Sequence, residues 1–135
     1  MFSALALVSI VSLVTPSGIL STTELAIYLK LIGSNAGCPG RIACRDVDVA
    51  MQLKKDGISV DSRSIVAWAS TENQVTAFTE SNKFVICANP EFLQKGACLA
   101  IFRERGKIIL VLNIKNARAT GIQLSPDLIK VAKII

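Results

Sequence analysis

Residues 64–88, SIVAWASTENQVTAFTESNKFVICA, decide the fold class of this chain. Two mostly apolar runs, at residues 64–69 and 83–88, flank a polar segment that starts at residues 70–72 and has the length of a short helix. Apolar runs without alternation are typical of strands that are covered on both faces, as in a parallel sheet. The stretch therefore predicts a strand, helix and strand joined by a right-handed crossover.

The residues before this unit repeat the same pattern. Residues 21–24 (STTE) form a capping box at the start of an amphipathic helix. Residues 41–44 are a short apolar strand, Asp46 caps a second helix that ends at Gly57, and residues 58–60 fit a short edge strand. The order of strands and helices indicates a sheet that is parallel in this part.

The residues after the unit change the character of the sheet. Residues 97–103 and 107–113 are two strands, and residues 104–106 (ERG) predict a three-residue hairpin loop with glycine at the position of positive φ. A short helix follows over residues 113–120, and residues 125–127 (SPD) start a closing helix. The buried side of that helix is expected to hold Leu128, Val131, Ala132 and Ile135.

These elements predict a single α/β domain over residues 21–135. We expect three layers, with a mixed sheet of about five strands that is parallel in its first part, antiparallel in its C-terminal hairpin, and flanked by helices. A chain of 135 residues, of which 51% are apolar and 19% charged, is long enough for one hydrophobic core and is globular rather than disordered.

Residues 1–20 differ from the rest because they carry no charge. A mostly apolar run from Ala4 to Val14 is too short to span a bilayer and ends at residues 15–18 (TPSG), which is typical of a secretory signal peptide. The first basic residue is Lys30, so the predicted signal peptide lacks the usual basic start. A retained anchor and a buried N-terminal helix or strand are the alternatives.

The cysteines fit an exported protein, and they are Cys38, Cys44, Cys87 and Cys98. An even number in a short exported chain allows two disulfides, in one of three connectivities that the sequence does not separate. Buried free thiols are the alternative, because Cys44 and Cys87 each end an apolar run. Zinc is not expected, since the spacings lack a C-x2-C pair and the chain has no histidine.

No catalytic constellation is recognisable in the sequence. The chain has no histidine, and its close acidic pair, Asp46 and Asp48, lacks the third-strand aspartate of a phospho-receiver domain, where Trp68 or Ala69 stands. No glycine-rich phosphate loop follows a strand. We therefore expect no enzyme activity, cofactor or metal. Trp68 is a candidate for the wall of a ligand pocket, with a position in the core as the alternative.

Basic residues are concentrated in the last third of the chain. Residues 95–135 hold eight Lys or Arg against two acids, whereas residues 1–94 hold seven against eight, so the net charge of +5 arises there. Arg103, Arg105 and Lys107 lie at the tip of the predicted hairpin, and they are a candidate surface for an acidic partner or a membrane. An ordinary solvated turn is the alternative. Nucleic acid is not expected, because this part is poor in aromatic residues.

The C-terminal third also carries a recognisable order of motifs. From Phe92 the chain reads FLxKGA, an apolar strand, a charged turn with Gly106, a strand ending in Leu-Asn, and then ARATGI and SxxLIKxAKI. This order resembles the closing signature of the YfiR-like family of periplasmic proteins. The residues at the signature positions are Gly96, Asn113, Gly121, Ser125, Leu128 and Ala132. Residues 25–88 are similar to the family in layout only.

The resemblance implies a non-enzymatic periplasmic α/β protein that is often dimeric and sometimes held by disulfides. Some members of the family restrain an inner-membrane diguanylate cyclase by binding its periplasmic domain, which lowers cyclic diguanylate in the cytoplasm. From the resemblance we expect a periplasmic regulator whose partners are an inner-membrane signalling protein and a second copy of the chain. A small-ligand carrier or sensor and a structural interaction module are the alternatives.

Overall fold

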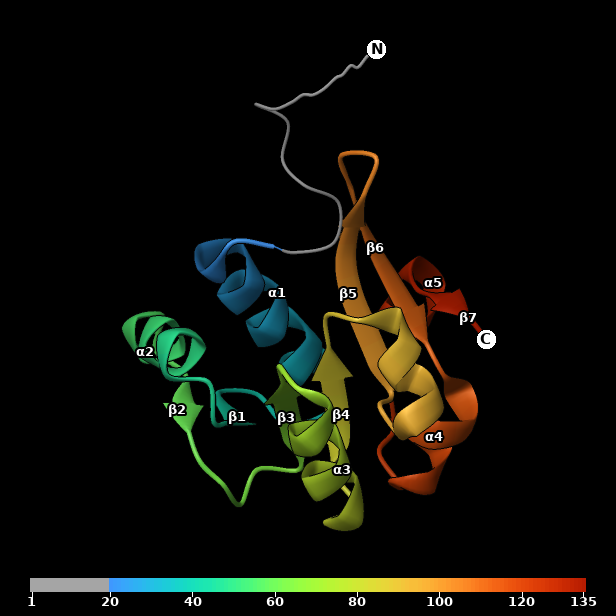
Figure 1. Cartoon of the computed structure of the whole chain (residues 1–135), viewed down its shortest axis with the longest axis horizontal. Helices are drawn as coiled ribbons and strands as arrows, with labels where there is room; N and C mark the ends of the chain where they lie inside the picture. The colour runs from blue at the N-terminus through green and yellow to red at the C-terminus, as the bar shows by residue number, and fades with distance from the viewer. Residues whose placement is uncertain (1–19) are drawn as a thin grey trace.

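Residues 20–135, which the computed structural model describes, form one mixed sheet with helices on both faces (Figure 1). The strands are β1 (Arg41–Cys44), β2 (Ser59–Val60), β3 (Val66–Ala69), β4 (Phe84–Cys87), β5 (Leu99–Glu104), β6 (Lys107–Leu112) and β7 (Lys133–Ile134). The helices are α1 (Thr22–Asn35), α2 (Val47–Lys55), α3 (Glu72–Glu80), the 3₁₀ helix η1 (Pro90–Lys95), α4 (Ile114–Ala119) and α5 (Pro126–Val131). No helix in this part of the chain is long and apolar enough to cross a membrane. Residues 1–19 of the predicted signal peptide lie outside the described residues.

The strands lie in the order β2-β1-β3-β4-β5-β6-β7. The strands from β1 to β5 are parallel, β6 is antiparallel to β5, and β7 is parallel to β6. The predicted mixed α/β sheet is therefore confirmed, although it has seven strands where the sequence predicted about five. The additional strands are the two-residue edge strands, of which β2 was indicated by the sequence and β7 was not.

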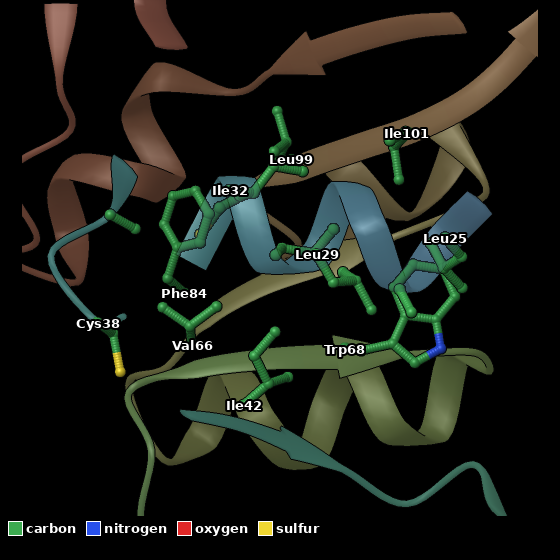
Figure 2. Packing of buried hydrophobic residues seen from close by; sticks show 14 of the residues in the cluster. Leu25, Leu29, Ile32, Cys38, Ile42, Val66, Trp68, Phe84, Leu99 and Ile101 are labelled. Carbon is green, nitrogen blue, oxygen red and sulfur yellow. The ribbon is translucent and has the colours of Figure 1, made fainter. Parts of the chain in front are cut away.

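One hydrophobic core lies between the sheet and α1, and we call it the α1-side core (Figure 2). Ile42, Val66 and Phe84 point from three adjacent strands toward the face covered by Leu29 and Ile32 of α1, and each of these side chains is at most 2% exposed. Buried leucines of α2 and α5 belong to the same core. Each large apolar side chain buried in this way contributes about 1.5–3 kcal/mol.

A second core lies on the opposite face, between the sheet and α3, and we call it the α3-side core. Because successive residues of a strand point to opposite faces, the strand residues Ala43, Ala67 and Val85 turn to this side. They pack with Val75 and Phe78 of α3. Helices thus cover both faces of the sheet, and the three-layer prediction is confirmed.

The predicted helix starts are capped by the residues that the sequence indicated. Glu24 donates its backbone N–H to Ser21 Oγ at 3.2 Å, and Ser21 donates its own N–H to Glu24 Oε1 at 3.3 Å, which completes the capping box. Asp46 accepts from the backbone of α2 at 3.2 Å, and Ser125 accepts from the N–H of Leu128 at 3.3 Å. Each cap stabilises the fold by about 1 kcal/mol.

The hairpin between β5 and β6 is tighter than predicted. Glu104 pairs directly with Lys107, so the loop contains only Arg105 and Gly106. Both loop residues have positive φ, 52° and 78°, as a type I′ turn requires. The prediction of a three-residue loop is therefore wrong by one residue. Two-residue turns of this type match the twist of the flanking strands, which extends the ladder to Glu104.

The closing helix is shorter than predicted. α5 ends at Val131, and Ala132 is extended with φ −88° and ψ 144°. The next residues pair with β6, and the N–H of Ile135 donates to Leu112 O at 2.9 Å. The predicted buried side is therefore wrong in part: Leu128 is buried, but Val131 is 68% and Ile135 56% exposed. Pairing with a free sheet edge replaces the last helical turn.

Candidate functional site

Arg103, the first residue of the predicted basic tip, faces the start of α1 instead of solvent. Its guanidinium Nη2 donates to Glu24 Oε2, and its Nη1 donates to Gly106 O at 3.3 Å. The Arg103 side chain is only 15% exposed. The hydrogen bond from Arg103, followed by the bond from the Ser21 backbone, holds the pKa of Glu24 below its ordinary value. Arg103 therefore connects β5 to α1 and is not part of an exposed basic patch.

Arg105 and Lys107 are the two exposed members of the predicted tip. The hairpin that carries them extends beyond the helices, and its turn is the outermost part of the described chain in Figure 1. Glu104 lies directly opposite Lys107 in the ladder and offsets part of the positive charge. The structure thus reduces the predicted surface of three basic residues to two.

An apolar surface that sequence analysis missed lies along the last strands. β7 pairs only with Val111 and Leu112, so residues 107–110 of β6 form an outer edge of the sheet. Next to this strand, α5, β7 and the residue after β7 expose apolar side chains that are 40–68% accessible: Ile129, Val131, Ile134 and Ile135. We call residues 107–110 together with α5 and β7 the C-terminal edge. Sequence analysis did not indicate this surface, because Val131 and Ile135 fitted the buried side of a longer closing helix.

Trp68 lies in the α1-side core. It is 3% exposed, and Figure 2 shows its indole among the side chains of that core. Its Nε1 is buried without a hydrogen-bond partner. The structure therefore places Trp68 where the alternative interpretation put it, because Leu25 and other residues of α1 close over the sheet. A ligand would contact the indole only after this packing opened.

The cysteines are free thiols in the structure, so neither of the two disulfides allowed by the sequence is formed. Cys38 and Cys98 belong to the α1-side core and Cys44 packs against it, whereas Cys87 belongs to the α3-side core. Each of the three connectivities would join Cys87 to a cysteine whose side chain packs on the opposite face of the sheet. Burial raises the pKa of Cys44 to about 11, of Cys87 to about 12 and of Cys98 to about 11.

Cys44, Cys87 and Cys98 are therefore poor nucleophiles and poor metal ligands, because both roles need the thiolate. Within residues 20–135, no group of three or more acidic or cysteine side chains could hold a metal ion. Cys38 Sγ lies 3.3 Å from Ser64 Oγ, and Cys87 Sγ donates to Asn89 O at 3.2 Å. The described cysteines thus have the environment of small core residues.

The signature residues near α4 hold a turn and a helix end. Gly96 ends η1 with a φ of 117°, and a Cβ atom there would lie 2.7 Å from Thr79 Oγ1. Asn113 caps α4 by accepting from the N–H of Asn116 at 3.0 Å. The side-chain amides of both asparagines donate to Leu93 O, at 3.1 and 2.8 Å. This part of the signature therefore fixes α4 against η1.

The signature residues near α5 are also structural. Gly121 has a φ of 77°, which only glycine adopts readily. Ser125 donates its hydroxyl to Asn35 Oδ1 and its N–H to Asn35 O at 2.9 Å, so it connects α5 to the end of α1. Leu128 is buried in the α1-side core, and Ala132 is half-buried beside it. None of these residues offers a side chain to a partner.

The fold and its exposed features define a small three-layer α/β domain with a mixed sheet and an accessible C-terminal edge. The model of the YfiR/HmsC-like family matches residues 53–133, which is more than half of the chain. The chain therefore belongs to the YfiR/HmsC-like family. The match begins well before Phe92, so it also includes strands that resembled the family only in layout.

A search of the curated proteins finds no match. Among solved structures, the chain is similar to a conserved domain protein from Vibrio cholerae O1 biovar El Tor strain N16961, with a TM-score of 0.61 and 14% sequence identity. The similarity covers 84% of this chain and 59% of the Vibrio chain. At this identity the likeness supports the fold alone, and the chain spans about three fifths of the length of its structural relative.

Proposed function

We propose that this chain is a non-enzymatic regulatory protein of the bacterial periplasm that binds the periplasmic part of an inner-membrane signalling protein. The observation that carries the proposal is membership of the YfiR/HmsC-like family. Some members of the family that the C-terminal signature resembles restrain a diguanylate cyclase in this way. Binding by this chain would hold its cyclase inactive and lower cyclic diguanylate in the cytoplasm. A second copy of the chain is a further partner implied by the resemblance.

The raised thiol pKa values and the chain's lack of histidine support a function in binding rather than catalysis. The C-terminal edge is the surface that we assign to the partner. Residues 107–110 of β6 offer a sheet edge that accepts an added strand, since backbone pairing supplies affinity without a special sequence. Val131 and Ile134 beside it supply apolar area, and Arg105 and Lys107 favour an acidic partner.

The proposal is tested by measuring the binding of the purified chain to the periplasmic domain of an inner-membrane diguanylate cyclase from the same organism. We expect saturable binding by calorimetry. The double variant Arg105→Glu and Lys107→Glu should bind at least about tenfold more weakly, because like charges facing an acidic partner repel. Neither residue is buried, so thermal stability should fall only by the small cost of a second carboxylate opposite Glu104.

The matched control is Lys54→Glu with Lys55→Glu, which makes the same charge change in the last turn of α2. This control should bind like the unchanged chain. Equal weakening by both double variants would show a general charge effect and contradict the assignment of the hairpin tip. Absence of binding by the unchanged chain would contradict the proposed partner.

A further inference from the structure

A hollow of about 380 Å³ lies on the α3 side of the sheet, beside α3. α3 packs chiefly on β3 and β4, and the hollow lies beside this packing, next to the buried Ala43 of β1. The residues around it come from the end of β1, the loop after β2, and the end of α3. Those used below are Ala43, Arg45, Ser62, Phe78, Ser81 and Lys83.

Two cations border this hollow. The guanidinium carbon of Arg45 lies 5.0 Å from the centroid of the Phe78 ring, so the two groups form a cation–π contact. The Lys83 ammonium donates to Ser64 O, which uses one of its three donors and leaves two. Ser62 and Ser81 are exposed and add hydroxyl groups. The hollow is therefore lined by positive charge and hydrogen-bond donors.

No acidic residue lines this hollow. The carboxylates nearest in sequence are engaged elsewhere, since Asp46 caps α2 and Asp61 pairs with Arg63 at 3.2 Å. Glu80 precedes Ser81 and is exposed. The C-terminus of α3 lies at this end and favours cations, which gives an alternative reason for the position of Lys83. It does not account for Arg45, which follows β1 and contacts the Phe78 ring.

We propose that this hollow binds a small metabolite through an oxyanion group, a carboxylate or a phosphate, placed between Arg45 and Lys83. Charge-assisted hydrogen bonds to these cations supply the affinity, and the edges of the largely buried Ala43 and Phe78 bound the apolar remainder. The hollow is too small and too polar at its rim for a protein partner. The proposal does not rest on the regulatory function proposed above.

The test is a titration of the nitrogen-15-labelled chain with inorganic phosphate and, separately, with succinate, at constant ionic strength kept with chloride. We expect saturable shifts of the amide signals of Arg45, Ser62 and Lys83 with at least one of the two anions. Saturation by phosphate alone assigns the site to phosphates, and saturation by succinate alone assigns it to carboxylates. Absence of saturable shifts with both anions would overturn the proposal.

A pair of variants separates a built site from general attraction to a basic protein. Arg45→Gln should weaken binding about tenfold, because it removes a charged hydrogen-bond donor. Arg105→Gln removes the same charge at the hairpin tip and should bind like the unchanged chain. Equal weakening in both variants would also overturn the proposal. Arg45 is exposed, so the fold of its variant is checked by the same amide spectrum.

Discussion

At the scale of single residues, Gly96 shows why a signature position is required by the fold. Its backbone adopts a φ of 117°, and the space where a side chain would start is occupied by Thr79. Thr79 is β-branched and half-buried, with its Oγ1 fully covered, so it cannot easily turn away. Position 96 therefore combines a conformational and a steric demand for glycine.

We expect Gly96→Ala to lower the free energy of unfolding by about 2–4 kcal/mol, because it adds a close contact to the strain of a left-handed residue. The measurement is urea denaturation followed by circular dichroism. Gly57→Ala is the matched control, since Gly57 has a φ of 83° and no heavy atom within 4 Å of the added Cβ. That control should lose about 1 kcal/mol. Equal losses at both positions would show that Thr79 yields without cost.

Residue patterns explain which features the sequence could predict. The caps at Ser21, Asp46 and Ser125 depend on residues within three positions, so local reading placed them correctly. The ion pair between Arg103 and Glu24 joins residues 79 positions apart, and no local pattern indicates it. The sequence placed Arg103 at the basic tip together with Arg105 and Lys107, because nothing in the local pattern indicated that its side chain lies against α1.

At the scale of elements, the Arg103–Glu24 pair connects the start of α1 to β5. Glu24 also belongs to the capping box, so one carboxylate serves a helix end and a strand. Its pKa is lowered in the folded chain, chiefly by the hydrogen bond from Arg103. The stabilisation from this group is therefore present above its ordinary pKa of 4.5 and is lost as the pH falls through the lowered value.

We expect the unchanged chain to lose more stability than Glu24→Gln when the pH falls from 6 to 3. Glutamine keeps the capping box but carries no charge that protonation can remove. Urea midpoints of both proteins at each pH measure the difference. Glu72→Gln is the control, because Glu72 is exposed and lies 3.9 Å from Lys95, and it should keep the original pH dependence. The same pH dependence in the unchanged chain and in Glu24→Gln would contradict the role of this pair.

Element boundaries also show where sequence reading fails. The strands β3 and β4 and the helix between them follow from one contiguous apolar and polar pattern, and they were predicted correctly. β7 was missed because Ser125 and Pro126 mark the start of a helix strongly but say nothing about where it ends. Its end depends on the unpaired edge of β6, which is a property of the assembled sheet.

At the scale of the whole molecule, the sheet divides the chain into two cores and assigns the cysteines to different sides. Two disulfides would need Cys87 to pair with a cysteine of the other core. The sequence allowed this because spacing alone carries no information about the face on which a residue lies. In the structure all four cysteines are free thiols, of which Cys38, Cys87 and Cys98 are buried and Cys44 is half-buried.

We expect the folded chain to react slowly with iodoacetamide at pH 8 and the unfolded chain to show four thiols without any reductant. With a pKa of about 11, only about one Cys44 in a thousand is a thiolate at pH 8, and the reaction should accelerate as the pH rises. Mass spectrometry counts the labelled cysteines. Fewer than four labels in the unfolded chain would reveal a disulfide and contradict this packing.

The division into two cores also determines how mutations combine. Leu29 of α1 and Val75 of α3 lie in different clusters and share no packing partner there, so their losses of stability are expected to add. Leu29 and Phe84 lie in one cluster, and their effects are expected to couple. Substitutions in the helices on one face of the sheet should therefore not alter the effect of substitutions in the helix on the other face. Only the strands, which contribute side chains to both cores, link the two.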